Sequence, residues 1–389
     1  MVDKNHGLPE ELLNLPDSDF EMVQAGEIKD EKFKTKPVGF FKDALFRLRK
    51  SKISVVSFWI IMAIVILSLL VPSITGYTYT EQSVRQKNLP PKIPFLEDLG
   101  IADGTRVLTN RKKSSLEDTN RFPEGCVLEI IREYEANGVP VVDVKIDAYL
   151  YAGVPEGEYH WFGTDYLGRD LMTRLFQGAR ISLLIALLSV VTNVIIGVIY
   201  GSVAGYYGGK VDLVMDRIAD ILYDIPFIVA VTLFQLHLAQ KVGVVPSFLF
   251  AYVLTGWIGM AALTRKQFYR FKGQEFVLAA RTLGASDWRL MFKHIFPNAL
   301  GTIITSCALV IPNVISSETQ LTYLGIINLQ EFAGTSIGTL MSQGQVSMTS
   351  SPHAMFWPAL FVSLLLISFN LFGNGLRDAF NPTLRGGED

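Results

Sequence analysis

Long runs without charge dominate the pattern of apolar and polar positions along this 389-residue chain. The runs that contain no Asp, Glu, Lys or Arg are 53–71, 181–209, 225–236, 242–264, 299–317 and 354–376. A helix needs about 20 mostly apolar residues to cross a membrane, and in lipid its backbone must satisfy its own hydrogen bonds. The pattern therefore predicts an all-α polytopic membrane protein. Its six transmembrane helices are expected near 53–72, 181–206, 218–240, 243–264, 299–320 and 355–376.

The distribution of Lys and Arg around these runs predicts their orientation. Seven such residues lie in 34–52 and seven more in 265–298, whereas 321–353 contains none. Short loops rich in Lys and Arg stay in the cytoplasm. Because an even number of spans returns the chain to its starting side, we predict that both termini and the loop 265–298 are cytoplasmic. The third predicted span is short and contains Pro226.

Two segments flank the first span, which we place at 53–72. Residues 1–52 form a cytoplasmic segment, and 1–36 mix acids and bases with few large apolar residues, which is typical of a disordered tail. From 38 to 50, apolar residues recur at helical spacing among basic ones. This pattern favours an amphipathic helix on the inner leaflet, with an ordinary solvated helix as the alternative.

Residues 73–160 form a long polar insert that we predict to be an extracellular α+β domain between the first two helices. Residues 142–149 alternate apolar and polar, which is the pattern of a half-buried strand. A second candidate strand covers 127–134, and Asn137-Gly138 between the two is a favoured hairpin turn. The insert is either a structural cap or a docking surface for a partner. The remaining chain, 161–389, is the predicted membrane core.

The composition excludes several classes of protein. Hydrophobic residues make up 49% and charged residues 19% of the chain, against about 25% charged in soluble domains. A net charge of −2 argues against nucleic-acid binding, which normally requires a strongly basic surface. The two cysteines, Cys126 and Cys307, cannot build a disulfide framework, and no metal-binding spacing of Cys and His is present. We therefore expect no metal site.

Glycines recur every four residues in the second span, at Gly197, Gly201, Gly205 and Gly209. Such a repeat allows a neighbouring helix to approach closely, so we predict a packing role for these four residues. The stretch around Gly209 is no phosphate loop, because Ala204 and Val211 stand where such a loop needs Gly and Ser or Thr. A transporter built on this chain must take its energy from another subunit or from an ion gradient.

Polar residues inside apolar spans are candidates for lining a pathway. We select Asn193, Asp224, Asn313 and Glu318. Asp224 is expected near the inner end of the third span and Glu318 near the outer end of the fifth, where water reaches them. No relay of Asp, Glu and His runs through the spans, which argues against an ion-coupled carrier.

The loop 265–298 carries the most informative pattern. Apolar and small residues give it two short helical faces, with Gly284 at the turn and Asp287 placed to cap the second helix. The first face is formed by Phe276, Ala279, Ala280 and Leu283, and the second by Trp288, Met291, Phe292 and Ile295. The loop either docks another protein or packs only on its own helices.

This loop resembles the cytoplasmic signature of bacterial ATP-binding-cassette (ABC) importer permeases, Glu-Ala-Ala, three residues, Gly, and a distal Ile-Leu-Pro. The matching residues are Leu278-Ala279-Ala280, Gly284 and Ile295-Phe296-Pro297. Leu278 stands where the family usually has Glu. Three further stretches resemble the C-type subunit of the peptide and nickel permeases: His160–Asp170, Ala204–Asp212 and Gly373–Ala379. The insert is longer than we expect for this subunit.

The resemblance implies a type I importer fold and a permease subunit of an ATP-driven oligopeptide importer in the bacterial cell membrane. The implied partners are a homologous B-type permease, two ATP-binding subunits, an extracellular solute-binding protein, peptide substrate and membrane lipid. The chain itself would not be an enzyme and would bind no cofactor, since ATP and Mg would bind to the ATPases. The residues implied in ATPase coupling are Glu275, Leu278, Ala279, Ala280, Arg281, Gly284, Ala285, Asp287 and Trp288.

Two alternatives stay open at this point. Nickel or another solute is carried by closely similar subunits, so the family resemblance does not fix the cargo. A membrane receptor or scaffold would instead use the long insert 73–160 to sense a ligand.

Overall fold

The computed structural model describes residues 39–330 and 334–380, so the tail predicted at 1–36 lies outside the described residues. Within them, five helical stretches are long and apolar enough to cross a membrane. They are Lys52–Ile74 (α3), Leu171–Tyr207 (α5), Val244–Phe271 (α8, Val244–Thr255, and α9, Ile258–Phe271), Asp287–Tyr323 (ending in α12, Phe296–Tyr323) and His353–Phe380 (α15). Upstream, Phe40–Lys50 forms the predicted amphipathic helix α2; its contact with lipid stays a prediction.

The third predicted span, 218–240, is not one helix. It is divided into α6 (Gly209–Tyr223) and α7 (Phe227–Val242), which are bent by 71°. The break contains Ile225-Pro226, and proline both lacks an N–H donor and disfavours helical geometry in the residue before it. The described residues therefore contain five candidate spans, or six when the bent pair counts as one.

Helix α5 begins ten residues before the predicted span. Asp170 caps it, because its Oδ2 accepts a hydrogen bond of 2.7 Å from the Thr173 backbone N–H. The added turns contain Arg180, whose charge ends the apolar run in the sequence, and Arg174, whose side chain is fully buried. A paired charge thus extends the helix beyond the run that hydropathy detects.

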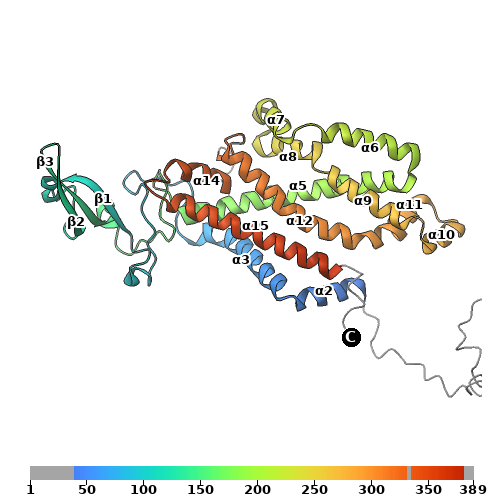
Figure 1. Cartoon of the computed structure of the whole chain (residues 1–389), viewed down its shortest axis with the longest axis horizontal. Coiled ribbons are helices and arrows are strands. Elements are labelled where there is room, and N and C mark those ends of the chain that lie inside the picture. Colours follow the sequence, from blue (N-terminus) through green and yellow to red (C-terminus); the bar gives the residue numbers. More distant parts are fainter. Residues whose placement is uncertain (1–38, 331–333, 381–389) are drawn as a thin grey trace, which may run out of the picture. The chain divides into compact units, whose positions relative to one another are not determined.

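Helix α5 packs against α9 (Figure 1). Three of its glycines lie at this contact. A Cβ atom added at Gly197 would lie 2.7 Å from Met260 Cβ, one at Gly201 2.9 Å from Thr264 Cβ, and one at Gly205 2.7 Å from Phe268 Cβ. These glycines therefore set the distance between the two helices. Gly209 departs from the predicted packing role: it has a φ of +56°, no atom within 4 Å of an added Cβ, and opens α6.

The insert contains a three-stranded antiparallel sheet in the order β1-β3-β2 (Figure 1). The strands are β1 (Thr105–Lys112), β2 (Val127–Ala136) and β3 (Val139–Asp147), and a short helix, α4 (Ala148–Ala152), follows. The predicted hairpin is confirmed, with Asn137 and Gly138 both at positive φ in its turn. One face is closed by a small core of Phe122, Cys126, Val142, Val144 and Ile146.

Segment 83–92 of the insert runs beside residues 160–170, the stretch that leads into α5. The Asn88 N–H donates to the Asp165 carbonyl over 2.9 Å, and the Lys92 N–H donates to the His160 carbonyl over 3.0 Å. Gly163 and Gly168, both at a φ of +77°, leave no room for a Cβ beside this segment. Much of the motif at 160–170 therefore anchors the insert to the membrane core.

A further helix that the sequence pattern did not predict, α14 (Ile337–Val346), lies between α12 and α15. It packs on both (Figure 1). Ser336 caps it by accepting from the Thr339 backbone N–H at 3.2 Å.

Candidate functional sites

The loop after α9 folds as an elbow. Helix α10 (Glu275–Thr282) ends at a turn where Gly284 has a φ of +81°, which favours glycine. A helical turn, α11 (Asp287–Arg289), and a π-helical turn (Leu290–Ile295) follow and continue directly into α12. The second short helix expected from the sequence is thus the beginning of the fourth long helical stretch, Asp287–Tyr323. We call residues 275–295 the elbow.

Buried apolar side chains fix the elbow to the ends of α5 and α9. Val277, Leu290 and Ile295 are fully buried, and they cluster with Tyr206 of α5 and Phe268 of α9. Ala280 and Ala285 pack against this cluster. The elbow is therefore a built element of the fold rather than a free loop.

The side of the elbow that faces away from this cluster is apolar and largely exposed within the part of the chain that the structure describes. Leu283 is 88% exposed and Trp288 65%, while Phe276 and Leu278 are each more than 40% exposed. Ala279 is exposed beside them, as are the charged groups of Glu275 and Arg281. Large apolar side chains gathered on one exposed element are typical of an interaction surface.

Asp287 has a role other than the predicted cap. Ser286 occupies the N-cap position, without a side-chain hydrogen bond. The Asp287 carboxylate instead accepts a hydrogen bond of 2.6 Å from the Tyr206 hydroxyl, and Arg281 Nη2 donates to the same hydroxyl over 3.4 Å. Both arms of the elbow are thereby tied to the C-terminal end of α5.

The four candidate pathway residues do not come together. Glu318 is fully buried, accepting from Ser182 Oγ at 2.7 Å and from Thr322 Oγ1 at 3.1 Å, rather than lying at a wet helix end. Asn193 is buried beside Gly256. Asp224 is exposed at the break between α6 and α7, and Asn313 is exposed on α12.

Asn313 belongs to a polar stripe that the sequence analysis missed. On α12 the stripe consists of Thr302, Ser306, Asn313, Ser317 and Gln320, spaced by three, four or seven residues and all at least partly exposed. The opposite face of α12 carries buried residues such as Val314, Ile315 and Glu318. The stripe could have been predicted, because its polar residues recur at helical spacing in the sequence. It was missed because these residues lie within a mostly apolar run that we interpreted only as a span.

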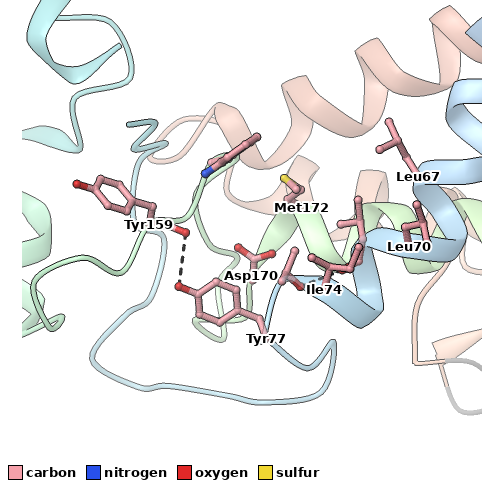
Figure 2. Close-up of a pocket in the computed structure, with 10 residues that line it drawn as sticks. Leu67, Leu70, Ile74, Tyr77, Tyr159, Asp170 and Met172 are labelled. Carbon is pink, nitrogen blue, oxygen red and sulfur yellow. Dashed lines mark hydrogen bonds between the residues drawn. The ribbon is translucent and has the colours of Figure 1, made fainter. Parts of the chain in front are cut away.

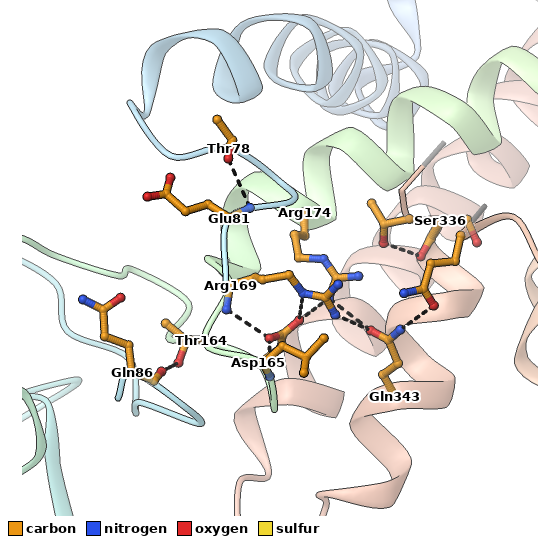
Figure 3. Close-up of polar contacts among 12 residues, drawn as sticks. Thr78, Glu81, Gln86, Thr164, Asp165, Arg169, Arg174, Ser336 and Gln343 are labelled. Atoms are coloured by element: carbon orange, nitrogen blue, oxygen red, sulfur yellow. Dashed lines mark hydrogen bonds and ion pairs between the residues drawn. The ribbon is translucent and has the colours of Figure 1, made fainter. Parts of the chain in front are cut away.

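Four polar side chains meet where α5 begins (Figure 3). Asp165 Oδ2 accepts from Arg169 Nε at 2.8 Å and from Arg174 Nη1. Gln343 of α14 accepts from Arg174 Nη1 at 3.0 Å and from Arg169 Nη2 at 3.4 Å. Since the three charged side chains are at most 4% exposed, the cluster is a buried structural clamp between α5 and α14.

A cavity of about 350 Å³ lies between the C-terminal end of α3 and the start of α5 (Figure 2). Its walls are mainly apolar, including Leu67, Leu70 and Met172, and its polar groups come from Thr75, Tyr77, Tyr159 and Asp170. Tyr77 donates to the Tyr159 carbonyl over 3.5 Å (Figure 2). These polar groups serve the structure at this end of α5, and Asp170 is already engaged by His160 and the helix cap.

Comparison with known proteins places this geometry in a family. Residues 197–386 match the family model of the binding-protein-dependent transport system inner membrane component, and residues 39–91 match the N-terminal transmembrane domain of oligopeptide transport permease C. The oligopeptide transport system permease protein OppC of Bacillus subtilis is 33% identical over 372 residues, covering 96% of this chain and 99% of the relative. The chain belongs to the oligopeptide and dipeptide ABC transport permeases. It is thus a multi-pass membrane protein of a transporter family.

Other permeases of this family bear on the length of the insert. The dipeptide permease DppC of Lactococcus lactis is 36% identical, covering 95% of this chain and 98% of the relative. The OppC protein of Escherichia coli is 38% identical but covers only 61% of this chain and 77% of its own length. The Bacillus and Lactococcus relatives match at least 95% of this chain, so their matches include most of the insert. These relatives therefore have inserts of similar length, contrary to our expectation that the insert is unusually long.

Two solved structures are similar over about half of the chain. The MetNI methionine ABC transporter has a TM-score of 0.43 and 15% identity, covering 54% of this chain and 98% of that chain. An amino acid ABC transporter crystallised with histidines has a TM-score of 0.40 and 13% identity, covering 54% and 92%.

Proposed function

We propose that this permease forms half of the translocation path of an ATP-driven peptide importer in the bacterial cell membrane. The other half is a homologous permease of the B type. Two cytoplasmic ATPases drive the assembly and an extracellular binding protein delivers the peptide. The observation that carries the proposal is the exposed apolar elbow in a member of a peptide permease family.

The geometry of the elbow supports a coupling role. Trp288 and Leu283 offer an apolar surface that fits a cleft on an ATPase, and Trp288 lies on a helix that continues unbroken to Tyr323. A displacement of the elbow is therefore transmitted to α12 and, through Tyr206, to α5. This mechanism is a rigid-body switch between inward-open and outward-open states.

The elbow predicts how Gly284 variants behave. Gly284→Arg places a bulky charge at a position of positive φ on the docking surface, so we expect ATP-driven peptide uptake to fall at least tenfold while insertion into the membrane is unchanged. Gly273→Arg is the matched control, since a Cβ at Gly273 also meets nothing within 4 Å but its φ is not positive. Uptake is measured in cells that express the whole transporter. Undiminished uptake by Gly284→Arg would contradict the coupling role.

The energy source and the cargo are tested by reconstitution. The purified single chain is expected to hydrolyse no ATP, and the complete complex to accumulate labelled peptide only with ATP. Excess unlabelled peptide should compete with this uptake, whereas Ni²⁺ should not. Competition by Ni²⁺ alone would assign a metal cargo, and robust ATPase activity of the single chain would refute a permease role.

A further inference from the structure

A groove of about 400 Å³ lies at the inner end of α12, on the same face as the polar stripe. Helix α9 contributes Leu263, Gln267 and Arg270, and α15 contributes Arg377 and Phe380. The floor is α12 itself, from Gly301 to Leu309. The groove therefore lies at the end of the stripe that is nearer to the elbow.

Most polar groups of this groove are available to bind a ligand, although the Thr305 hydroxyl already donates to the Thr302 carbonyl over 2.9 Å. Arg270 and Arg377 are both exposed, and neither pairs with a carboxylate within residues 39–330 and 334–380. Gln267 Oε1 is buried without a hydrogen-bond partner in the same residues. The hydroxyls of Thr302, Thr305 and Ser306 also line the groove. Two guanidinium groups beside neutral donors are a recognition set for a carboxylate or a phosphate.

We propose that this groove binds the C-terminal carboxylate of the peptide as it leaves the translocation path. This inference rests on the proposed function. Oligopeptides differ in their side chains but share a backbone and a terminal carboxylate. The stripe offers hydroxyl and amide groups that hydrogen-bond any peptide backbone, and the two arginines recognise the one charge that every unmodified peptide carries at its C-terminus.

The stripe favours a peptide over a phospholipid as the occupant. A lipid whose phosphate lay between Arg270 and Arg377 would place its acyl chains along the face of α12 above the groove. That face carries Asn313 and Gln320, whose amide oxygens would lie against hydrocarbon. The Ser317 hydroxyl and Gln320 Nε2 on the same face already donate to the Asn313 carbonyl and to Ser316 Oγ. A peptide backbone satisfies the two amide oxygens.

The test uses the complete transporter in liposomes, with a labelled peptide and its C-terminal amide as probes. The variant is Arg270→Gln together with Arg377→Gln. The matched control is Arg217→Gln on α6, whose side chain is 73% exposed and pairs only with Asp220 at 3.2 Å. We expect the double variant to lose uptake of the free-acid peptide by about tenfold, since charge-assisted hydrogen bonds of this kind are worth that factor or more. Uptake of the amide should not change, and Arg217→Gln should affect neither peptide.

A second readout avoids the selectivity of the binding protein. Equilibrium dialysis of the labelled peptide against the complex without its binding protein should show retention by wild type and Arg217→Gln, but not by the double variant. Stimulation of ATP hydrolysis by the binding protein should be unchanged in all three, because the elbow is intact.

Different failures overturn different claims. If the double variant transports and retains both peptides like wild type, the groove does not bind the carboxylate, although the proposed function stands. If uptake of both peptides falls equally and the loss varies with the fraction of anionic lipid, the groove binds a lipid phosphate instead. If the wild-type complex transports no peptide, the proposed function fails and this inference with it.

Discussion

Where α5 begins, the buried side chains of Asp165, Arg169 and Arg174 meet Gln343. Removing one partner of a buried ion pair leaves uncompensated charge, which costs about 3–5 kcal/mol. We expect Asp165→Asn to lower the free energy of unfolding by that amount, because two arginines then lose their counter-charge. Chemical denaturation of the purified protein in mixed micelles measures the change.

The control for this prediction is a surface pair in the insert. Lys113 and Glu133 approach to 2.9 Å but both side chains are about half exposed. Glu133→Gln should therefore change the free energy of unfolding by less than about 1 kcal/mol. Equal effects of the two variants would show that the Asp165 cluster is solvated rather than buried.

The glycines of α5 give a second prediction for single residues. Gly201→Ala forces a methyl group against Ala261 and Thr264 of α9, so we expect a loss of about 1–3 kcal/mol from overpacking. Gly259→Ala is the matched control, because it is also helical but meets nothing within 4 Å; alanine there should be neutral or stabilising by up to about 1 kcal/mol. Thermal unfolding in detergent measures both. A stable Gly201→Ala protein would mean that α5 and α9 are farther apart.

Residue-level prediction from the sequence succeeded where a local pattern decides the outcome. The four-residue glycine period placed Gly197, Gly201 and Gly205 at a helix contact, but nothing local named α9 as the partner. Glu318 illustrates the opposite case. Its position near a helix end suggested water, whereas its hydroxyl partner Ser182 comes from 136 residues earlier in the chain. Such long-range pairs are set by tertiary packing.

At the scale of elements, the elbow allows coupling to the ATPase to be disrupted without a change in the stability of the fold. Leu283 is 88% exposed, so Leu283→Asp costs little burial and should leave thermal stability within about 0.5 kcal/mol of wild type. Its effect on uptake should be a loss of tenfold or more, because the charge enters an apolar contact with the ATPase. Val346→Asp, at 89% exposure on α14, is the control and should change neither quantity. A variant that transports normally would remove Leu283 from the docking surface.

The sequence predicted those elements whose hydrophobic period lies within a single short segment. The hairpin of β2 and β3 followed from alternation and an Asn-Gly turn. Strand β1 was missed because it is mostly polar and its register with β3 shifts between Leu108 and Arg111. Pro226 is evident in the sequence and indicates a break in the helix. The 71° angle between α6 and α7 is not evident, because it depends on how α7 packs against α8.

At the scale of the whole molecule, the insert is tied to the membrane core. Arg106 Nη2 of β1 donates to the Asn88 carbonyl at 3.0 Å and to Ser351 Oγ at 3.2 Å, just before α15. Together with the ladder between 83–92 and 160–170, this contact holds the start of the sheet against the segments that lead into α5 and α15. The sequence predicted an insert of mixed structure but not this attachment, because its partners are up to 245 residues apart.

The predicted orientation requires the insert and the elbow to lie on opposite sides of the membrane. In a Cys126→Ala, Cys307→Ala background, Ser114→Cys marks the insert and Ser286→Cys marks the elbow; both positions are exposed. A membrane-impermeant maleimide added to intact cells should label Ser114→Cys at once and Ser286→Cys only after lysis. A Cys307→Ala protein that keeps Cys126 is the separate control for folding, because Cys126 is fully buried and burial, followed by the charge of Asp147, raises the pKa of its thiol. A raised pKa keeps the thiol protonated and unreactive near pH 7, so Cys126 should react only after denaturation. Labelling of Ser286→Cys in intact cells would reverse the topology and place the elbow out of reach of any cytoplasmic ATPase.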